Sequence, residues 1–364
     1  LGRLDDATAE RLYRTIEFGN LDSDEVSEYQ LLSGRLAEAE GRPDQALDTY
    51  GQVIAADVRP TRAEAVYRTI LVLDKTGRID AAKATKTLAA EALLWRGDRL
   101  EANMDKLLAD LYFRSGQYRL GFETAKQTVE YFPSSPAMDA LSSEAQHEFE
   151  NLYLNGEADR MPPVAALALY YDFRALTPPG TSGDQMIRNL AERLVKVDLL
   201  SQAAELLKYQ IDNRLKGAAQ AQIAAELAVI DIANRKPDEA LKVLNSTALA
   251  ELPPSLERQR RILEGRALID ANRIDLALDI LSSVSGRDAD QLRVAANWSA
   301  KNYEKVGNLL EVMYGPSESG SSGPELSQAA RMDLVRAAVA YALAGDRIGV
   351  SRLRGKFADA MAKG

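Results

Sequence analysis

The chain has 364 residues, of which 46% are hydrophobic and only 6% aromatic. This composition excludes a largely disordered chain and favours closely packed helices over strands. The formal net charge of −9 argues against nucleic-acid binding as the main role, and the absence of Cys excludes disulfides, thiolate metal sites and cysteine nucleophiles. The sequence has no apolar run long enough to span a membrane.

A six-residue turn signature recurs seven times along the chain. Its copies occupy residues 2–7, 41–46, 77–82, 116–121, 198–203, 235–240 and 272–277. The closing small residues are 36 to 39 positions apart, except for one gap, from Gly121 to Ala203, that is close to two such periods. A fixed period of this length predicts stacked helical hairpins, because a single hairpin cannot bury its own apolar face.

The first copy of the signature precedes a predicted helix over residues 4–18. That helix is the second of a hairpin whose first helix is missing, so we expect the chain to be a fragment of a larger protein. The first full hairpin is predicted over residues 25–57. In it Gly34 and Ala46 are small where the two helices must approach closely, and Tyr50 fills the gap one turn later.

The first full hairpin resembles the tetratricopeptide repeat (TPR). The residues that match are Gly34, Gly41, Ala46, Tyr50 and, loosely, Pro60. The next two hairpins, residues 62–95 and 100–133, keep the turn and most of the small residues, with Gly77 and Ala82 in one and Ala109, Gly116 and Gly121 in the other. The resemblance implies an all-α fold, a right-handed α-solenoid of about nine TPR-like hairpins.

Beyond residue 133 the pattern first weakens and then returns. Residues 134–183 are predicted to form an irregular hairpin and a Pro/Gly linker, with 177–184 the most loop-like part. Residues 184–364 are predicted to form regular hairpins again, with an exposed loop over 315–324 and a final hairpin over 325–362. Arg352, Arg354 and Lys356 suit a terminal helix that faces water. We therefore expect three parts: 1–133, 134–183 and 184–364.

Three segments in the middle of the chain, residues 170–174, 202–207 and 210–214, resemble the C-terminal part of long alphaproteobacterial TPR proteins. Proteins of that kind tend to begin with an export signal. The resemblance implies a periplasmic location, with the cytoplasm as the alternative.

Residues with catalytic potential are few. The single histidine, His147, has no nucleophile turn near it and is best explained as a partly exposed helix residue. Residues 180–183 and 320–323 lack the Lys of a phosphate loop and are interpreted as linkers. Tyr170 and Phe173 share one helical face, which favours core packing over a ligand platform. We predict no catalytic, cofactor or metal site.

Binding surfaces are the better candidates. In TPR folds the first helices of successive hairpins line a groove, and this resemblance implies a partner-binding surface here. Its residues would be Arg35, Glu38, Glu64, Tyr67, Asp74, Lys106, Asp110 and Phe113 in the N-terminal half and Arg188, Glu192, Ile262, Arg266 and Ile269 in the C-terminal half. Asp110, one turn after Lys106, would repel a carboxylate, which disfavours binding of a chaperone's C-terminal tail.

A second candidate surface is the basic cluster of Arg258, Arg260, Arg261 and Arg266. It would suit an acidic partner segment, but Glu251, Glu257 and Glu264 balance it, which favours a solvated helix start.

These observations favour a non-enzymatic scaffold that binds a protein or peptide in its groove, as part of a bacterial envelope protein. One alternative is the docking arm of a larger enzyme, for example one that acts on peptidoglycan, whose catalytic domain lies upstream. Another is a homodimer formed through a terminal repeat.

Overall fold

The computed structural model describes residues 21–59, 61–97, 99–133, 136–315 and 326–362, together with Thr8, Tyr13 and Thr15. Most of the helix predicted over 4–18, all but Gly315 of the loop predicted over 315–324, and Pro60 lie outside the described residues. The chain divides into two compact units, Leu1–Pro179 and Gly180–Gly364. The division falls within the Pro/Gly-rich segment 177–184, while the three-part organisation stays a prediction.

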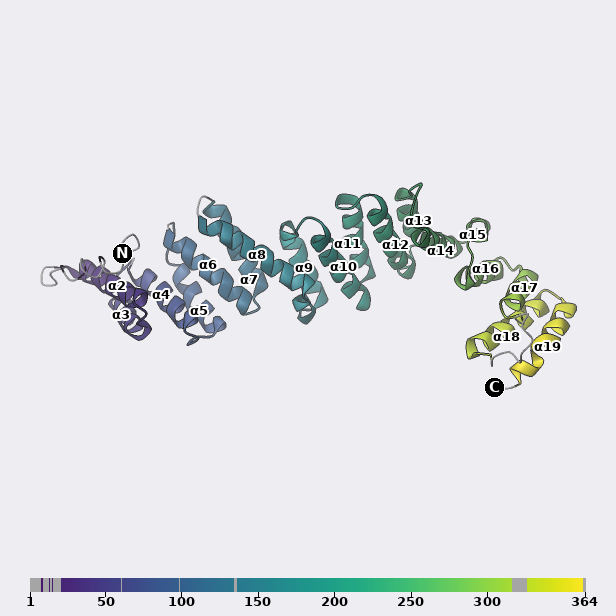
Figure 1. Cartoon of the computed structure of the whole chain (residues 1–364), viewed down its shortest axis with the longest axis horizontal. Helices are drawn as coiled ribbons and strands as arrows, with labels where there is room; N and C mark the ends of the chain where they lie inside the picture. The colour runs from purple at the N-terminus through teal and green to yellow at the C-terminus, as the bar shows by residue number, and fades with distance from the viewer. Residues whose placement is uncertain are drawn as a thin grey trace. The chain divides into compact units, whose positions relative to one another are not determined.

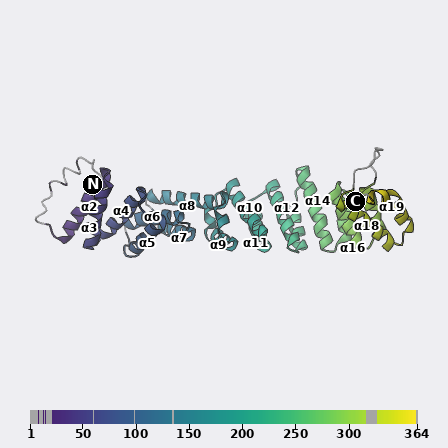
Figure 2. The same cartoon turned by 90° about the horizontal axis from the view of Figure 1, so that it is seen from below.

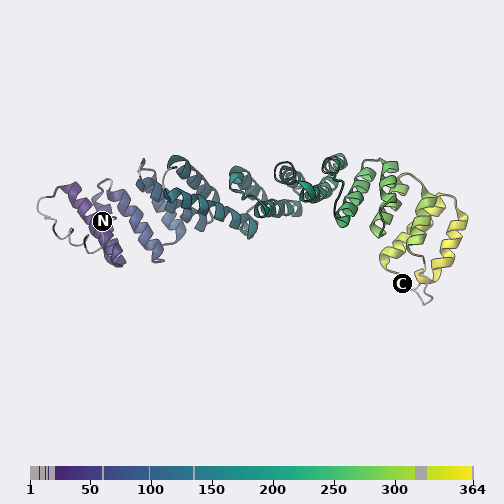
Figure 3. The same ribbon diagram turned by 45° about the horizontal axis from the view of Figure 1, so that its top comes forward.

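The described residues of unit 1 from Leu21 onward form four helical hairpins (Figure 1). The three regular ones pair α2 (Ser23–Ala39) with α3 (Pro43–Ala56), α4 (Thr61–Lys75) with α5 (Ala81–Ala92), and α6 (Arg99–Arg114) with α7 (Tyr118–Tyr131). The irregular one contains α8 (Pro136–Leu154), the 3-10 helix η2 (Glu157–Arg160), α9 (Pro163–Phe173) and the 3-10 helix η3 (Arg174–Leu176). In Figure 3 the helices from purple to blue follow one another in chain order, as stacked hairpins do.

Unit 2 contains five hairpins within residues 180–315 and 326–362, the part of it that the structure describes. They pair α10 (Thr181–Lys196) with α11 (Leu200–Asn213), α12 (Gly217–Ala233) with α13 (Pro237–Ser246), α14 (Pro254–Asp270) with α15 (Ile274–Ser282), α16 (Arg287–Ser299) with α17 (Tyr303–Met313), and α18 (Gln328–Leu343) with α19 (Arg347–Met361). Figure 2 shows α10, α11, α12 and α14 side by side in chain order. Helix α10 begins at Thr181, so residues 181–183, predicted to be linker, form its first turn instead.

The described part of the chain is therefore an all-α solenoid of TPR-like hairpins, as predicted, and it contains no strand. The right-handed turn expected from the resemblance stays a prediction.

The recurring turn is a helix C-terminus with one left-handed residue. Its φ is +73° at Gly41, +67° at Gly77 and +73° at Gly116, and non-glycine residues take the same conformation in other hairpins, for example +58° at Arg235 and +60° at Lys301. In every regular hairpin the next backbone N–H donates to the carbonyl five residues earlier, with N···O distances of 2.8 to 2.9 Å. This arrangement is the Schellman motif, which satisfies carbonyls that the helix leaves free.

Small residues let the paired helices approach, as predicted. A Cβ at Gly34 would collide with the Tyr50 ring, which is fully buried. In the second hairpin Ala82 was predicted to be the small residue at the contact between the helices, and this prediction is wrong. Helix α5 begins only at Ala81, so Ala82 lies in its first turn, before the helices meet. Ala82 is exposed there, and Ala84 is the fully buried small residue instead.

The last hairpin also differs from expectation. Arg352 and Lys356 do not simply face water, because both bind the buried carboxylate of Glu311 in α17. The Tyr341 hydroxyl is a third donor to this carboxylate, at 2.7 Å. Although burial opposes ionisation, the hydrogen bonds from Arg352, Lys356 and Tyr341 lower the pKa of Glu311 to about 2. This cluster ties α17, α18 and α19 together.

Candidate functional site

The first helices of successive hairpins form one continuous surface in each unit, called here the first-helix face. Helices α2, α4, α6 and α8 contact one another in sequence in unit 1, and α12, α14 and α16 do so in unit 2. The predicted groove residues all belong to these first helices. What they contact decides whether they are available to a partner.

At the start of unit 1 the predicted groove charges are paired within the fold. Arg35 Nη1 lies 3.7 Å from Glu64 Oε1, and Arg68 binds both Glu64, at 2.8 Å, and Glu38, at 3.2 Å. Glu38 also accepts a hydrogen bond from the Tyr50 hydroxyl at 2.9 Å. These contacts join α2, α3 and α4, so the side chains hold the stack together as well as lining its surface.

A second paired group lies between α4 and α6. Arg114 binds the Asp74 carboxylate through two hydrogen bonds of 2.6 and 2.8 Å and reaches Asp110 at 3.0 Å. The bidentate contact with Arg114 lowers the pKa of Asp74. On α8, burial and then Asp110 raise the pKa of Glu144, while Lys106 opposes the shift. Lys106 thus lies among acidic side chains, and the expectation that this surface disfavours a carboxylate stays a prediction.

Two predicted aromatic contacts are less accessible than expected. Phe113 was expected in the groove, but it is only 5% exposed, and that prediction is wrong. Its ring lies against Gly121, where a Cβ would collide with it, and packs on Phe122 with ring centroids 4.9 Å apart. Tyr67 is half-buried and packs against the core between α4 and α6. Neither ring is a free surface residue.

In unit 2 the first-helix face has an open cavity of about 350 Å³. It lies between α10 and α12, which approach each other less closely than α12 and α14 do. Its apolar lining includes Val195 and Val229, which are 37% and 47% exposed. Two of the predicted residues, Arg188 and Glu192, line it.

The polar lining of this cavity is not fully satisfied. The Arg188 side chain donates to Gln185 at 2.6 Å, but its Nε atom is buried without a hydrogen-bond acceptor in the described structure. Burial raises the pKa of Glu226; Glu192 adds to this rise and Arg188 opposes it. With Lys196, the lining has two acids and two bases around an apolar centre. Such a surface suits an uncharged, partly apolar segment that offers a hydrogen-bond acceptor.

The remaining predicted residues of unit 2 lie outside the cavity. Arg266 is exposed and paired with Asp270 at 3.1 Å on the same helix. Ile262 and Ile269 are half-buried, and Ile269 packs against the core of α12 to α15.

The basic cluster of α14 is dispersed rather than a single patch. Arg261 pairs with Glu257 at 2.9 Å, which fits the predicted solvated helix start. Arg260 is different, since it is 7% exposed and donates to the carbonyls of Ala221 and Leu244, both at 2.6 Å. The sequence offers no local signal for this role, because its partners lie on other helices.

The other candidates have the structural roles that were favoured. His147 is exposed on α8. Tyr170 and Phe173 are 1% and 6% exposed and belong to an aromatic core with Phe149. In the described ranges no three His, Cys, Asp or Glu side chains gather closely enough to hold a metal ion. Nor does any helix of those ranges have the length and apolar character of a membrane span.

Comparisons with known proteins give similarity of fold only. No protein-family model and no curated protein matches the chain. Among solved structures it is similar to the TPR2AB domain of yeast Sti1 in complex with pHSP90, with a TM-score of 0.33, 11% identity, and coverage of 78% of this chain and 96% of that one. It is also similar to Naa15/Naa10 bound to HypK-THB, with a TM-score of 0.37, 11% identity, and coverage of 92% and 51%. The helical hairpins themselves show the architecture, which is that of stacked TPR-like hairpins.

Proposed function

We propose that the chain is a non-enzymatic scaffold that binds a segment of a partner protein on the first-helix face of unit 2. The observation that supports this most is the open cavity between α10 and α12, with its exposed valines and the unsatisfied Nε of Arg188.

The cavity defines the chemistry of the segment. An aliphatic side chain of the partner contacts Val195 and Val229, and a backbone carbonyl accepts from the guanidinium of Arg188. A free carboxylate is disfavoured because Glu192 and Glu226 border the same space. The surface of unit 1 is a weaker candidate, since its charges pair with one another.

Selection of peptides from a displayed random library against the purified chain tests the proposal. Peptides that bind should have an aliphatic residue and should bind Val229→Arg at least about tenfold more weakly in fluorescence anisotropy, because the new charge blocks the cavity. Leu276→Arg on α15 is the matched control, since Leu276 is 56% exposed and lies outside the cavity. Failure to select any peptide, or equal affinity for Val229→Arg, would refute the proposal.

We further infer that the scaffold works in the bacterial periplasm, which rests only on the resemblance to alphaproteobacterial repeat proteins. Protease treatment of spheroplasts that express the natural gene provides the test. A periplasmic protein is digested before lysis, whereas a protein protected until lysis contradicts this inference.

A further inference from the structure

A charged residue occupies a core position of unit 2. In each regular hairpin the Schellman hydrogen bond ends on the backbone carbonyl of one residue near the end of the first helix. These acceptor residues are structurally equivalent from one hairpin to the next. In unit 2 these residues are Leu194, Asp231, Leu268, Asn297 and Tyr341, all 6% exposed or less. In the regular hairpins of unit 1 they are Ala37, Leu73 and Tyr112. Asp231 is the one carboxylic acid in this set.

The polar members of this set differ in how they are satisfied. The Asn297 amide donates to the Arg293 carbonyl at 2.9 Å, and the Tyr341 hydroxyl donates to Glu311. The residue Asp231 is 6% exposed, and its carboxylate has no hydrogen bond or ion pair to any described residue. Its oxygens are not among the fully buried atoms, so they are accessible from the cavity that Asp231 lines. A buried carboxylate without a partner destabilises the fold, and such costs are usually found where they serve a site.

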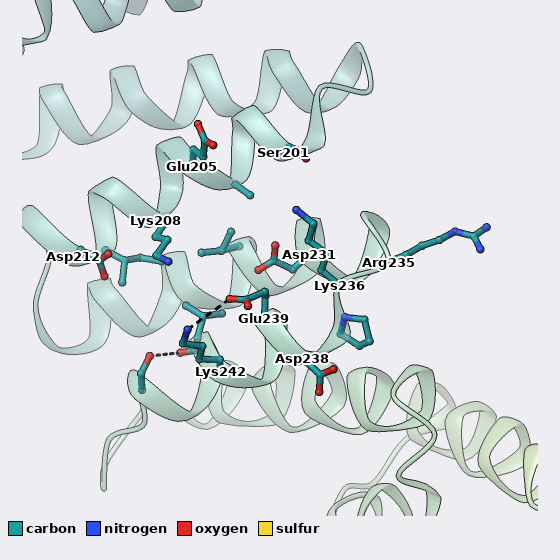
Figure 4. Close-up of a pocket in the computed structure, with 16 residues that line it drawn as sticks. Ser201, Glu205, Lys208, Asp212, Asp231, Arg235, Lys236, Asp238, Glu239 and Lys242 are labelled. Carbon is teal, nitrogen blue, oxygen red and sulfur yellow. Dashed lines mark hydrogen bonds and ion pairs between the residues drawn. The ribbon is translucent and has the colours of Figure 1, made fainter.

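Asp231 lines a cavity of about 660 Å³ between α11, α12 and α13. Figure 4 shows it in the middle of the lining, with Lys208 on one side and Lys236 on the other. Ile211 and Leu227 provide apolar walls. The remaining charged lining residues are Glu205 and Asp212 of α11, Arg235 of the turn, and Asp238, Glu239 and Lys242 of α13. Five acids thus face four bases, and Glu239 is engaged with Lys242 at 4.0 Å.

We propose that this cavity binds an alkylammonium group, either of a small diamine or of a lysine side chain, with the Asp231 carboxylate as its main acceptor. A compact ammonium, which is a point charge, suits the single carboxylate of Asp231 better than a planar guanidinium does. The apolar walls accommodate the methylene stem of such a ligand. A metal ion is a poorer fit, because no three carboxylates of the described chain come close enough together.

The protonation of Asp231 gives the site a pH dependence. Burial, and then Glu239, raise the pKa of Asp231 to about 6, while Lys236 and Lys208 oppose the shift. An ammonium binds the ionised carboxylate, so protons compete with the ligand below this pKa. The affinity is therefore expected to be about tenfold weaker at pH 5 than at pH 7.5.

Calorimetric titration of the full chain tests the proposal with 1,5-diaminopentane and with Nα-acetyl-lysine amide. Nα-acetyl-norleucine amide, which lacks the ammonium, should not bind. If both ammonium probes bind, the cavity accepts an alkylammonium group from either a small diamine or a lysine side chain. If only one binds, that probe shows which of the two is the ligand. If neither binds at pH 7.5, the proposal is wrong.

Two substitutions separate the site from a structural role. Asp231→Asn should weaken binding at least tenfold and abolish its pH dependence. Asp231→Leu restores the residue found in α10 and α14, so it should fold, raise the unfolding temperature and fail to bind. Asp279→Asn is the control, because it removes one negative charge from an exposed position on α15 and should leave binding unchanged. Binding retained in Asp231→Asn, or an unfolding temperature lowered by Asp231→Leu, would overturn the proposal. Neither result bears on the first-helix face.

Discussion

Replacement of Glu311 by Gln is expected to loosen the C-terminal end of unit 2. Glu311 is 5% exposed and accepts hydrogen bonds from Tyr341, Arg352 and Lys356. Gln keeps the size of the side chain and one acceptor oxygen but removes the charge that the two cations neutralise. The substitution therefore isolates the electrostatic part of the cluster.

The magnitude follows from the pKa of Glu311, which the fold lowers from 4.5 to about 2. A shift of this size corresponds to an upper limit of about 3 kcal/mol in favour of the ionised folded state. Arg352 and Lys356 are 41% and 43% exposed, so solvent screening reduces the expected loss at pH 7 to about 2 kcal/mol. Because the folded pKa lies below the unfolded one, this contribution is complete above about pH 5 and is lost as the pH falls toward 2.

Hydrogen exchange of the α18 and α19 amides measures this loss locally, which matters because stacked repeats need not unfold in one step. At pH 7 the opening free energy should be about 2 kcal/mol lower in Glu311→Gln than in the native chain. Urea unfolding of the same segment at pH 2 should show no difference. Glu304→Gln, an exposed acid on the same helix, is the control. Equal protection at pH 7, or a difference that persists at pH 2, would refute the reasoning.

Three further predictions concern packing, turns and buried carbonyls. Gly34→Ala should destabilise the chain by about 1–3 kcal/mol in thermal unfolding, because its Cβ meets the Tyr50 ring, whereas Gly51→Ala has open space and should be neutral or stabilising. Lys301→Gly should stabilise by about 0.5–1 kcal/mol, since Lys301 holds a left-handed conformation at φ +60°. A lower urea midpoint would contradict this. Arg260→Met should cost about 1–3 kcal/mol, because two carbonyls lose a buried charged donor, and unchanged exchange in α14 would argue against that role.

The hairpin architecture was predictable because its determinants are local. The turn needs a left-handed residue within a few positions of a helix end, and the close approach needs a small residue at a fixed distance from that turn. Gly34 with Tyr50 satisfies both conditions within one hairpin. The displaced small residue at Ala84 shows the limit, since a longer turn moves the whole second helix relative to the signature.

The charged contacts were not predictable in the same way. Arg260 donates to the carbonyl of Ala221, 39 residues earlier, and Arg352 reaches Glu311 over 41 residues. Such pairs depend on how neighbouring hairpins stack, and composition shows only that both charges exist. For the same reason the predicted groove residues of unit 1 are correctly placed on first helices, while their pairing with one another was not foreseen.

Phe113 shows that a residue on the second helix of a hairpin can determine whether a side chain on the first helix is buried or exposed. It lies three residues before the left-handed turn residue, the position that Asp74 and Val195 occupy in their own hairpins, where Asp74 is half-buried and Val195 is 37% exposed. Helical spacing alone therefore places Phe113 on the first-helix face. Five residues after the turn, however, this hairpin has Gly121 where the α10–α11 hairpin has Ala203, and the missing methyl group opens the space that the ring fills. An aromatic residue three positions before the turn residue, combined with a glycine five positions after it, is thus a sequence signal for a buried ring rather than for a binding contact.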